Sequence, residues 1–434
     1  MKNSKIVSVL YLLALMGLGA SCKKEIGSLN GSTIEELSSN ATKFQLNNVV
    51  TGTESGMRNS IDFYLDAVGM IGREMYRFAG SEPRYTSDLL GGGNATLNNN
   101  TFYLTNPWNA RYRVVKNCNI LIDAANNSTL IFPEEKKGYL GFAKTIKAYH
   151  LLLNLNLTYT NGVRIDVNDP DKLGAFVPYE DALTQIAAML DEAKTDLTGS
   201  TIAFTLSSGF DGLNDAAGLI KFNRALAARV AVYRKQWGPA LTALNESFFS
   251  LNGSFTTGAY HVFSSGPNDQ LNLTFFPQNN TGEIRLAHPS FAANITPGDD
   301  RIAKATLRTS AASLDGLTSN RDVWVYTSST ASMPIIRNEE LILIYAEAKI
   351  NQTQLPDAIV ALNRIRTGHN LAVYSGAVTQ AALITEMLFQ RRYSLYFEGH
   401  RWVDMRRYGN LGQLPLDRAG DDVWEKFPLP LTEN

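Results

Sequence analysis

Glu398, His400 and Asp404 lie close together in the sequence, in a segment rich in arginine and aromatic residues. A carboxylate beside a histidine can serve as a general acid–base pair or bind a metal ion. The alternative is a buried corner in which arginines of the same segment pair with the two carboxylates through charge-assisted hydrogen bonds. Buried charges are costly unless they are paired, so we favour the corner and expect no catalysis here. The arginines in question are Arg391, Arg392 and Arg401.

Other patterns of catalytic residues do not stand out in the chain. The five histidines show no His-Glu-x-x-His arrangement, and no Gly-x-Ser-x-Gly nucleophile elbow occurs. Cys118 has no activating neighbour in sequence, and its apolar surroundings suggest a small buried side chain. A glycosidase needs two carboxylates, and 41 acidic residues allow many pairs, but none has a distinctive local context. We therefore predict neither an enzyme nor a metal or cofactor site.

The segment 77–112 has the residue types that capture a sugar. Sugars present apolar faces to aromatic rings and hydroxyl groups to polar side chains, so a binding site combines both kinds of residue. The breaks in this segment, such as Gly91-Gly92-Gly93-Asn94, indicate loops. Ordinary packing is the alternative for each ring. The candidate ligand-binding residues of this segment are Arg84, Tyr85, Asp88, Trp108 and Asn109.

The elements that would position these residues are mostly helices that come in pairs. Apolar residues recur at helical spacing, with Ala, Leu and Tyr on one face and Pro or Gly at the breaks. This pattern is typical of degenerate tetratricopeptide-like repeats, although strict periodicity is absent. The predicted helices cover residues 134–159, 180–197, 223–237, 239–245, 338–351 and 356–366, and the last pair lies in the segment 383–407.

The segment 247–334 differs from the helical pairs. It is rich in Gly, Asn, Ser and Thr, with scattered aromatic residues. A long insertion of this kind is usually functional or disordered, and its rings favour an ordered, irregular lobe.

The first residues predict export and lipid attachment. Lys2 and Lys5 precede an apolar stretch that is too short to span a bilayer but suits a secretory signal. The stretch ends in small residues directly before Cys22, which looks like a bacterial lipobox. We expect a signal peptide at 1–21, lipidation of Cys22 and a tether at 22–30. An ordinary signal peptide with a coincidental cysteine is the alternative.

Composition agrees with a large secreted body. Of the 434 residues, 44% are hydrophobic and 19% charged, enough for a sizeable core. The formal net charge is -1, and loss of Lys2 and Lys5 with the signal would leave -3. A chain so close to neutral, without a basic run, is not expected to bind nucleic acid.

The segment 390–409 also carries a family resemblance. Its Phe397-Glu398-Gly399-His400-Arg401-Trp402 hexapeptide resembles the C-terminal signature of the SusD/RagB-like outer-membrane lipoproteins of Bacteroidota. The resemblance implies a mostly α SusD-like fold, with a degenerate tetratricopeptide-like helical-repeat scaffold and a second irregular, loop-rich lobe. It implies a single body at 31–434. The scaffold is expected at about 134–246 and 335–409, and the ligand-facing loops at about 77–112 and 247–334.

The resemblance also implies a function and adds two site residues. By analogy, Trp324 and Tyr326 contribute rings from the second lobe. The implied role is a lipoprotein on the outer membrane, facing the cell exterior. It binds a nutrient, most readily an oligosaccharide, and passes it to a SusC-like TonB-dependent transporter. The alternatives are a peptide-binding member of the family, a surface glycoside hydrolase, and an assembly subunit that only gates the transporter.

Overall fold

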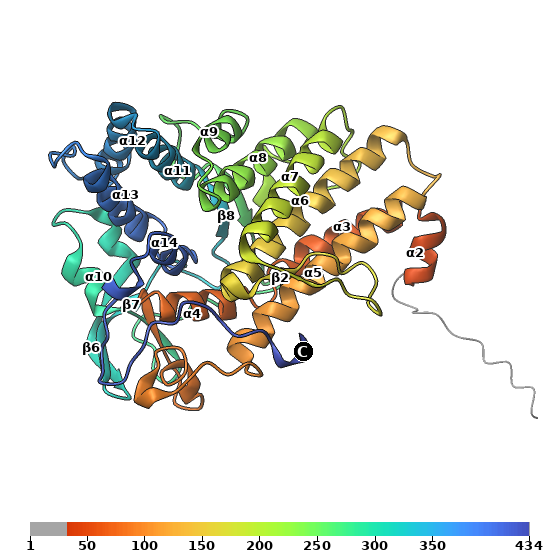
Figure 1. Ribbon diagram of the computed structural model, residues 1–434. Coiled ribbons are helices and arrows are strands. Elements are labelled where there is room, and N and C mark those ends of the chain that lie inside the picture. The colour runs from red at the N-terminus through yellow and green to blue at the C-terminus, as the bar shows by residue number, and fades with distance from the viewer. Residues whose placement is uncertain (1–32, 434) are drawn as a thin grey trace, which may run out of the picture.

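The computed structural model describes residues 33–433, so the predicted signal peptide (1–21) and tether (22–30) lie outside the described residues. Most of the described chain is helical, and helices that follow one another pack side by side in a curved array (Figure 1). Within residues 33–433, no helix is both long and apolar enough to cross a membrane. The fold is therefore the mostly α, helical-repeat architecture that was predicted.

Three shorter helices precede the array. They are α2 (Ile34–Asn40), α3 (Lys43–Gly56) and α4 (Ile61–Ile71). Thr33 and Thr42 are the N-caps of α2 and α3, and each forms a capping box. The threonine hydroxyl accepts a hydrogen bond from the backbone N–H three residues later, and the Glu or Gln side chain at that position accepts one from the threonine N–H. The array itself consists of α5 (Phe102–Asn127), α6 (Pro133–Thr158), α7 (Tyr179–Leu197), α8 (Ala216–Tyr233), α9 (Trp237–Asn245), α11 (Asn338–Asn351), α12 (Leu355–Gly368), α13 (Gln380–Ser394) and α14 (Arg401–Arg407).

Small residues allow the long helices to approach closely. A Cβ atom on Gly141 of α6 would lie 2.4 Å from Cγ of Leu197 in α7, so only glycine fits at this contact. Helix α5 corrects one boundary. The scaffold was expected to begin near residue 134, but α5 starts at Phe102 and takes up the last part of the expected loop 77–112.

The expected irregular lobe contains a small antiparallel sheet of order β1-β5-β7-β6. Strand β1 comes from before the helical array, and Met75 pairs with Ala287 of β5. Asp315 and Gly316 both have positive φ and form the two-residue turn between β6 and β7. The lobe also contains the short helix α10 (Pro289–Asn294). The strands of the sheet are β1 (Met75–Phe78), β5 (Ile284–Ala287), β6 (Ala305–Leu314) and β7 (Leu317–Val323).

Two further strand pairs lie outside this sheet. Strand β4 (Gly258–His261) pairs with β8 (Met333–Arg337), and β2 (Val163–Arg164) pairs with β3 (Phe176–Val177). Most buried apolar side chains form one core that runs through the sheet and the array. A second, smaller core lies between α11, α12 and α13.

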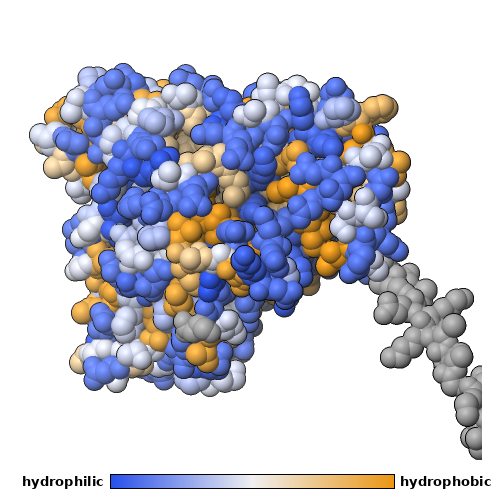
Figure 2. Space-filling model, turned by 45° about the vertical axis from the view of Figure 1, so that its right-hand side comes forward, coloured by the Kyte–Doolittle hydropathy of each residue, from blue (hydrophilic) through white to orange (hydrophobic). Residues whose placement is uncertain are grey.

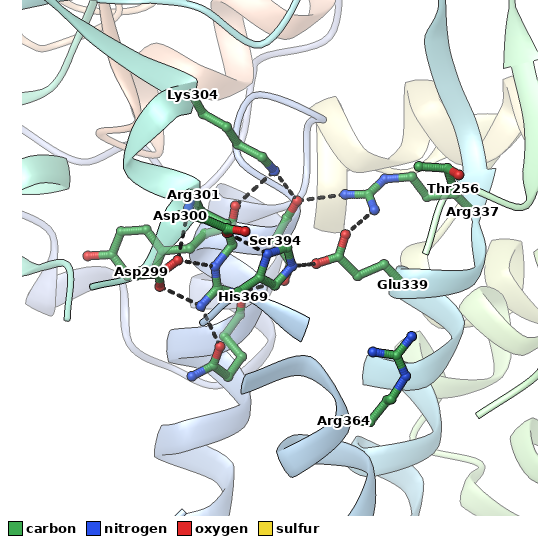
Figure 3. A network of polar contacts seen from close by, with 12 residues as sticks. Thr256, Asp299, Asp300, Arg301, Lys304, Arg337, Glu339, Arg364, His369 and Ser394 are labelled. Carbon is green, nitrogen blue, oxygen red and sulfur yellow. Dashed lines mark hydrogen bonds and ion pairs between the residues drawn. The ribbon is translucent and has the colours of Figure 1, made fainter. Parts of the chain in front are cut away.

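Charged side chains hold the lobe against the last helices (Figure 3). His369, at the end of α12, contacts Asp300 through Nδ1 at 2.8 Å and Glu339 through Nε2 at 2.7 Å. Arg301 forms a two-point contact with Asp299 and reaches Gln390 Oε1 of α13 at 2.7 Å. The 3-10 helix η5 (Asp300–Lys304) is thereby tied directly to the end of α12 and to α13, and through His369 to α11.

Candidate functional site

The segment with Glu398, His400 and Asp404 is a buried structural corner. Asp404 contacts Arg391 at 2.7 Å and Arg407 at 3.0 Å. Burial alone would raise the pKa of Asp404, but the two guanidinium groups lower it to about 2. Burial also lowers the pKa of His400 to about 4, which leaves this imidazole neutral at pH 7. The corner thus contains paired charges of the kind that was predicted.

One expected pairing in the corner is wrong. Glu398 does not bind an arginine of its own segment but accepts two hydrogen bonds from Arg337 of β8, the closer at 2.8 Å. Arg392 instead donates to Ser290 Oγ at 2.8 Å. Among residues 33–433, no group of three or more His, Cys, Asp or Glu side chains could hold a metal ion.

A cavity with aromatic walls lies where α4, the start of α5 and the lobe meet. It has a volume of about 580 Å³, and its rings come from segments far apart in sequence. We call it the aromatic groove. The exposed side chain of Leu273 lies at the rim of the aromatic groove. Figure 2 shows that one face of the molecule carries apolar surface among polar surface. Its aromatic side chains are Phe63, Tyr85, Phe102, Phe275 and Phe276.

Paired charges form the polar wall of the aromatic groove. The Phe276 ring lies 4.7 Å from the guanidinium carbons of both Arg77 and Arg285. Arg285 binds Asp66 through two hydrogen bonds of 2.6 and 2.7 Å, and Arg77 binds Glu283 at 2.5 Å. Because each arginine is neutralised, the wall offers fixed hydrogen-bonding groups rather than a net charge.

A smaller polar recess continues the aromatic groove along α5. Its volume is about 320 Å³, and it shares Asp62, Leu271 and Leu273 with the groove. Burial, followed by the neighbouring Asp66, raises the pKa of Asp62. Arg58 closes the far end of the recess and binds Asp269 at 2.6 Å. The remaining polar lining consists of Asn59, Ser60, Asn106, Asn109, Arg113 and Gln270.

The structure brings three of the predicted ligand residues to this site. Tyr85 lines the aromatic groove, although only 5% of it is exposed. Arg84 is exposed, binds Glu82 through two hydrogen bonds and lies 5.1 Å from the centre of the Phe102 ring. Asn109 is exposed and lines the polar recess.

Two of the predicted ligand rings are buried in the structure. Trp108 has 0% exposure, and its indole N–H donates to Glu433 at 2.9 Å, so the ring is part of the core. Tyr326 is 4% exposed and its hydroxyl donates to the Phe397 carbonyl at 3.3 Å. A ligand cannot reach either ring without displacing the core around it.

Two other predicted residues are not part of the lining of the groove or of the recess. Asp88 accepts hydrogen bonds of 2.8 Å from Ser87 and Tyr103, so its carboxylate supports the loop. Trp324 is half-buried, and its ring centre lies 6.0 Å from that of Phe275. Trp324 therefore contacts Phe275, a ring that lines the groove.

Phe63, Phe102, Phe275 and Phe276 were not predicted as site residues. The adjacent pair Phe275-Phe276 in a polar insertion was a weak signal, because the same segment also contains the pair Phe248-Phe249. The approach of Phe63 to Phe102, with ring centres 5.8 Å apart, has no counterpart in local sequence.

Comparison with known proteins shows what this chain and its fold are similar to. Residues 297–426 match the model of the SusD family. No curated protein matches the chain. The resemblance found in the hexapeptide is therefore confirmed: the part of the chain that contains it is similar to the SusD family.

Solved structures extend the likeness over most of the chain. A SusD superfamily protein from Bacteroides vulgatus is 16% identical with a TM-score of 0.69, covering 90% of this chain and 96% of its own. NanU of B. fragilis is 16% identical with a TM-score of 0.69, covering 93% and 97%. A surface glycan-binding protein A from Bacteroides thetaiotaomicron, solved with laminarihexaose, is 12% identical with a TM-score of 0.69, covering 91% and 97%. At these identities the likeness establishes the fold.

Proposed function

We propose that this protein binds an oligosaccharide in the aromatic groove and the adjoining polar recess. The observation that carries the proposal is the combination of half-exposed phenylalanine rings with neutralised arginine–carboxylate pairs in one open cavity. Rings stack against sugar faces, and fixed polar groups bind hydroxyls, so the lining fits a neutral polar ligand. The named glycan-binding relative with the same fold supports this choice of ligand.

The wider role follows from the family. We propose that the protein is lipidated at Cys22, faces the cell exterior on the outer membrane, and passes its ligand to a SusC-like TonB-dependent transporter. Capture beside the transporter raises the local concentration of ligand at the pore. This role requires binding without chemistry, which agrees with the buried corner and with the proposed absence of enzymatic activity.

The test is a titration of the purified protein against panels of oligosaccharides and peptides, followed by heat or tryptophan fluorescence. Phe276→Ala should weaken glycan binding at least about tenfold, because it removes a central ring flanked by two arginines. Phe44→Ala, which removes a ring that is 74% exposed on α3, is the matched control and should leave affinity unchanged.

Each outcome of the titration has a distinct meaning. Saturable glycan binding without release of reducing sugar, lost in Phe276→Ala alone, is the expected result. Peptide binding would replace the ligand class, and sugar release would indicate a glycoside hydrolase. No binding in either panel would contradict the proposed ligand and favour a subunit that only gates the transporter.

A further inference from the structure

A second pocket lies further along the exposed face of α5. It has a volume of about 500 Å³, within the roughly 300–1,000 Å³ of typical small-molecule sites. The Tyr112 hydroxyl donates to the Arg164 carbonyl at 2.9 Å and accepts from the Arg164 N–H at 3.0 Å. Tyr112 therefore contributes mainly its ring to the wall of the pocket. We call this cavity the α5 pocket, and its apolar lining is Ile34, Tyr112, Ile120, Val167, Pro170 and Leu173.

One buried polar atom of the α5 pocket has no partner. Asn119 is 6% exposed, and its amide nitrogen donates to the Val167 carbonyl at 3.3 Å. Its Oδ1 atom accepts no hydrogen bond from the described residues. An unsatisfied buried acceptor is costly, so this oxygen is a place where a ligand gains by supplying an N–H or O–H donor.

Two positive charges stand at the mouth of the same pocket. Arg113 and Lys116 lie one helical turn apart on α5, both are exposed, and neither pairs with an acid among residues 33–433. The third cation, Arg164, is already bound to Glu433 at 3.0 Å. Of the two acids that line the pocket, Asp123 is the one that is not paired with Arg164. Among the described residues, Arg113 and Lys116 therefore face a single unpaired carboxylate, and a net positive charge remains at the mouth.

We propose that the α5 pocket is a second binding site, for an amphipathic organic anion. The ligand places an apolar ring system against Ile120 and Leu173 and a hydrogen-bond donor at Asn119. Its anionic group lies between Arg113 and Lys116. This chemistry differs from that of a neutral sugar, and the proposal is independent of the one made for the aromatic groove. The α5 pocket and the polar recess share Asn109 and Arg113, so the two sites adjoin along one helix.

The probe for the test is 8-anilinonaphthalene-1-sulfonate, which carries fused rings, one N–H donor and a sulfonate. We expect its fluorescence to report one saturable site on the folded protein. Lys116→Glu and Leu173→Asp should each weaken binding at least about tenfold, because they reverse the charge at the mouth or place a like charge against the rings. Both side chains are exposed, so neither change should lower the unfolding temperature.

Matched changes elsewhere control for charge and polarity. Lys137→Glu alters an exposed lysine of α6, and Leu130→Asp alters a leucine that is 54% exposed, both outside the pocket lining. Both should bind the probe as the unaltered protein does. Asn119→Leu, which removes the acceptor at similar size together with the hydrogen bond to the Val167 carbonyl, should weaken binding of the probe to the folded protein.

Three results would overturn the proposal. The first is an affinity unchanged by both Lys116→Glu and Leu173→Asp. The second is equal loss in the control variants, which would show that net charge alone attracts the probe. The third is loss in Phe276→Ala with full binding in the α5 pocket variants, which would place the probe in the aromatic groove.

Discussion

Glu74 should make the stability of this protein fall as pH rises through neutrality. Its side chain is 4% exposed, Oε1 accepts the Phe397 N–H at 3.2 Å, and Oε2 has no partner among the described residues. Burial raises the pKa of this carboxyl from its ordinary value of 4.5 to about 8. At pH 7 the folded protein therefore keeps a proton that the unfolded chain has released. The perturbation that tests this is Glu74→Gln, which retains an oxygen for Phe397 and cannot ionise.

The magnitude follows from the two pKa values. The folded state binds more protons than the unfolded state between pH 4.5 and 8, so the free energy of unfolding falls as pH rises in this window. At about 1.4 kcal/mol per pKa unit, the contribution from Glu74 decreases by about 3 kcal/mol between about pH 5 and 7.5. Glu74→Gln lacks this decrease. Relative to the unaltered protein, it should gain about 3 kcal/mol over the same interval.

The assay is equilibrium unfolding in guanidinium chloride at several pH values across that interval. The buried histidines His261 and His400, whose pKa burial lowers to about 3 and about 4, also change stability with pH, in the opposite direction. They are present in both proteins, so the difference between the two curves isolates Glu74. Glu425→Gln, which alters an exposed carboxylate, should follow the unaltered protein. Parallel curves for Glu74→Gln and the unaltered protein would refute the reasoning.

Two further predictions concern the core and the membrane. Trp108→Ala should lower the free energy of unfolding by about 3–5 kcal/mol, because it empties a fully buried site. The glycan affinity of the folded fraction should stay unchanged. Weaker glycan binding at full stability would instead show that Trp108 contacts the ligand. Cys22→Ala should release the protein from membranes, as measured by fractionation and lipid labelling; a variant that stays bound and labelled would exclude Cys22 as the attachment point.

Local periodicity predicted the helical pairs and the corner, because apolar spacing depends on residues within a few turns. Trp108 could have been assigned to the core by the same reasoning. It lies four residues before Tyr112, which puts both rings on the same face of a helix, and the two ring centres are 5.1 Å apart. The Asp315-Gly316 turn between β6 and β7 was likewise available as a hairpin signal.

Long-range pairings could not be predicted in the same way. Strand β1 has only four residues and pairs with a strand more than two hundred residues later in the chain. The partner of Glu398 is Arg337, on a strand that no local pattern connects to the corner. The aromatic groove depends on such pairings, because the sheet brings residues 271–276 to the start of α5. Most of the rings that line the groove were therefore not predictable from local sequence.

The placement of the groove rings has a consequence for evolution. Phe63, Phe275 and Phe276 line the groove but do not belong to either buried core. Under the proposed function, exchange of these side chains changes what is bound and leaves both buried cores intact. Ligand preference then changes at little cost to folding. The same architecture is kept in solved structures that share only 12–16% identity with this chain.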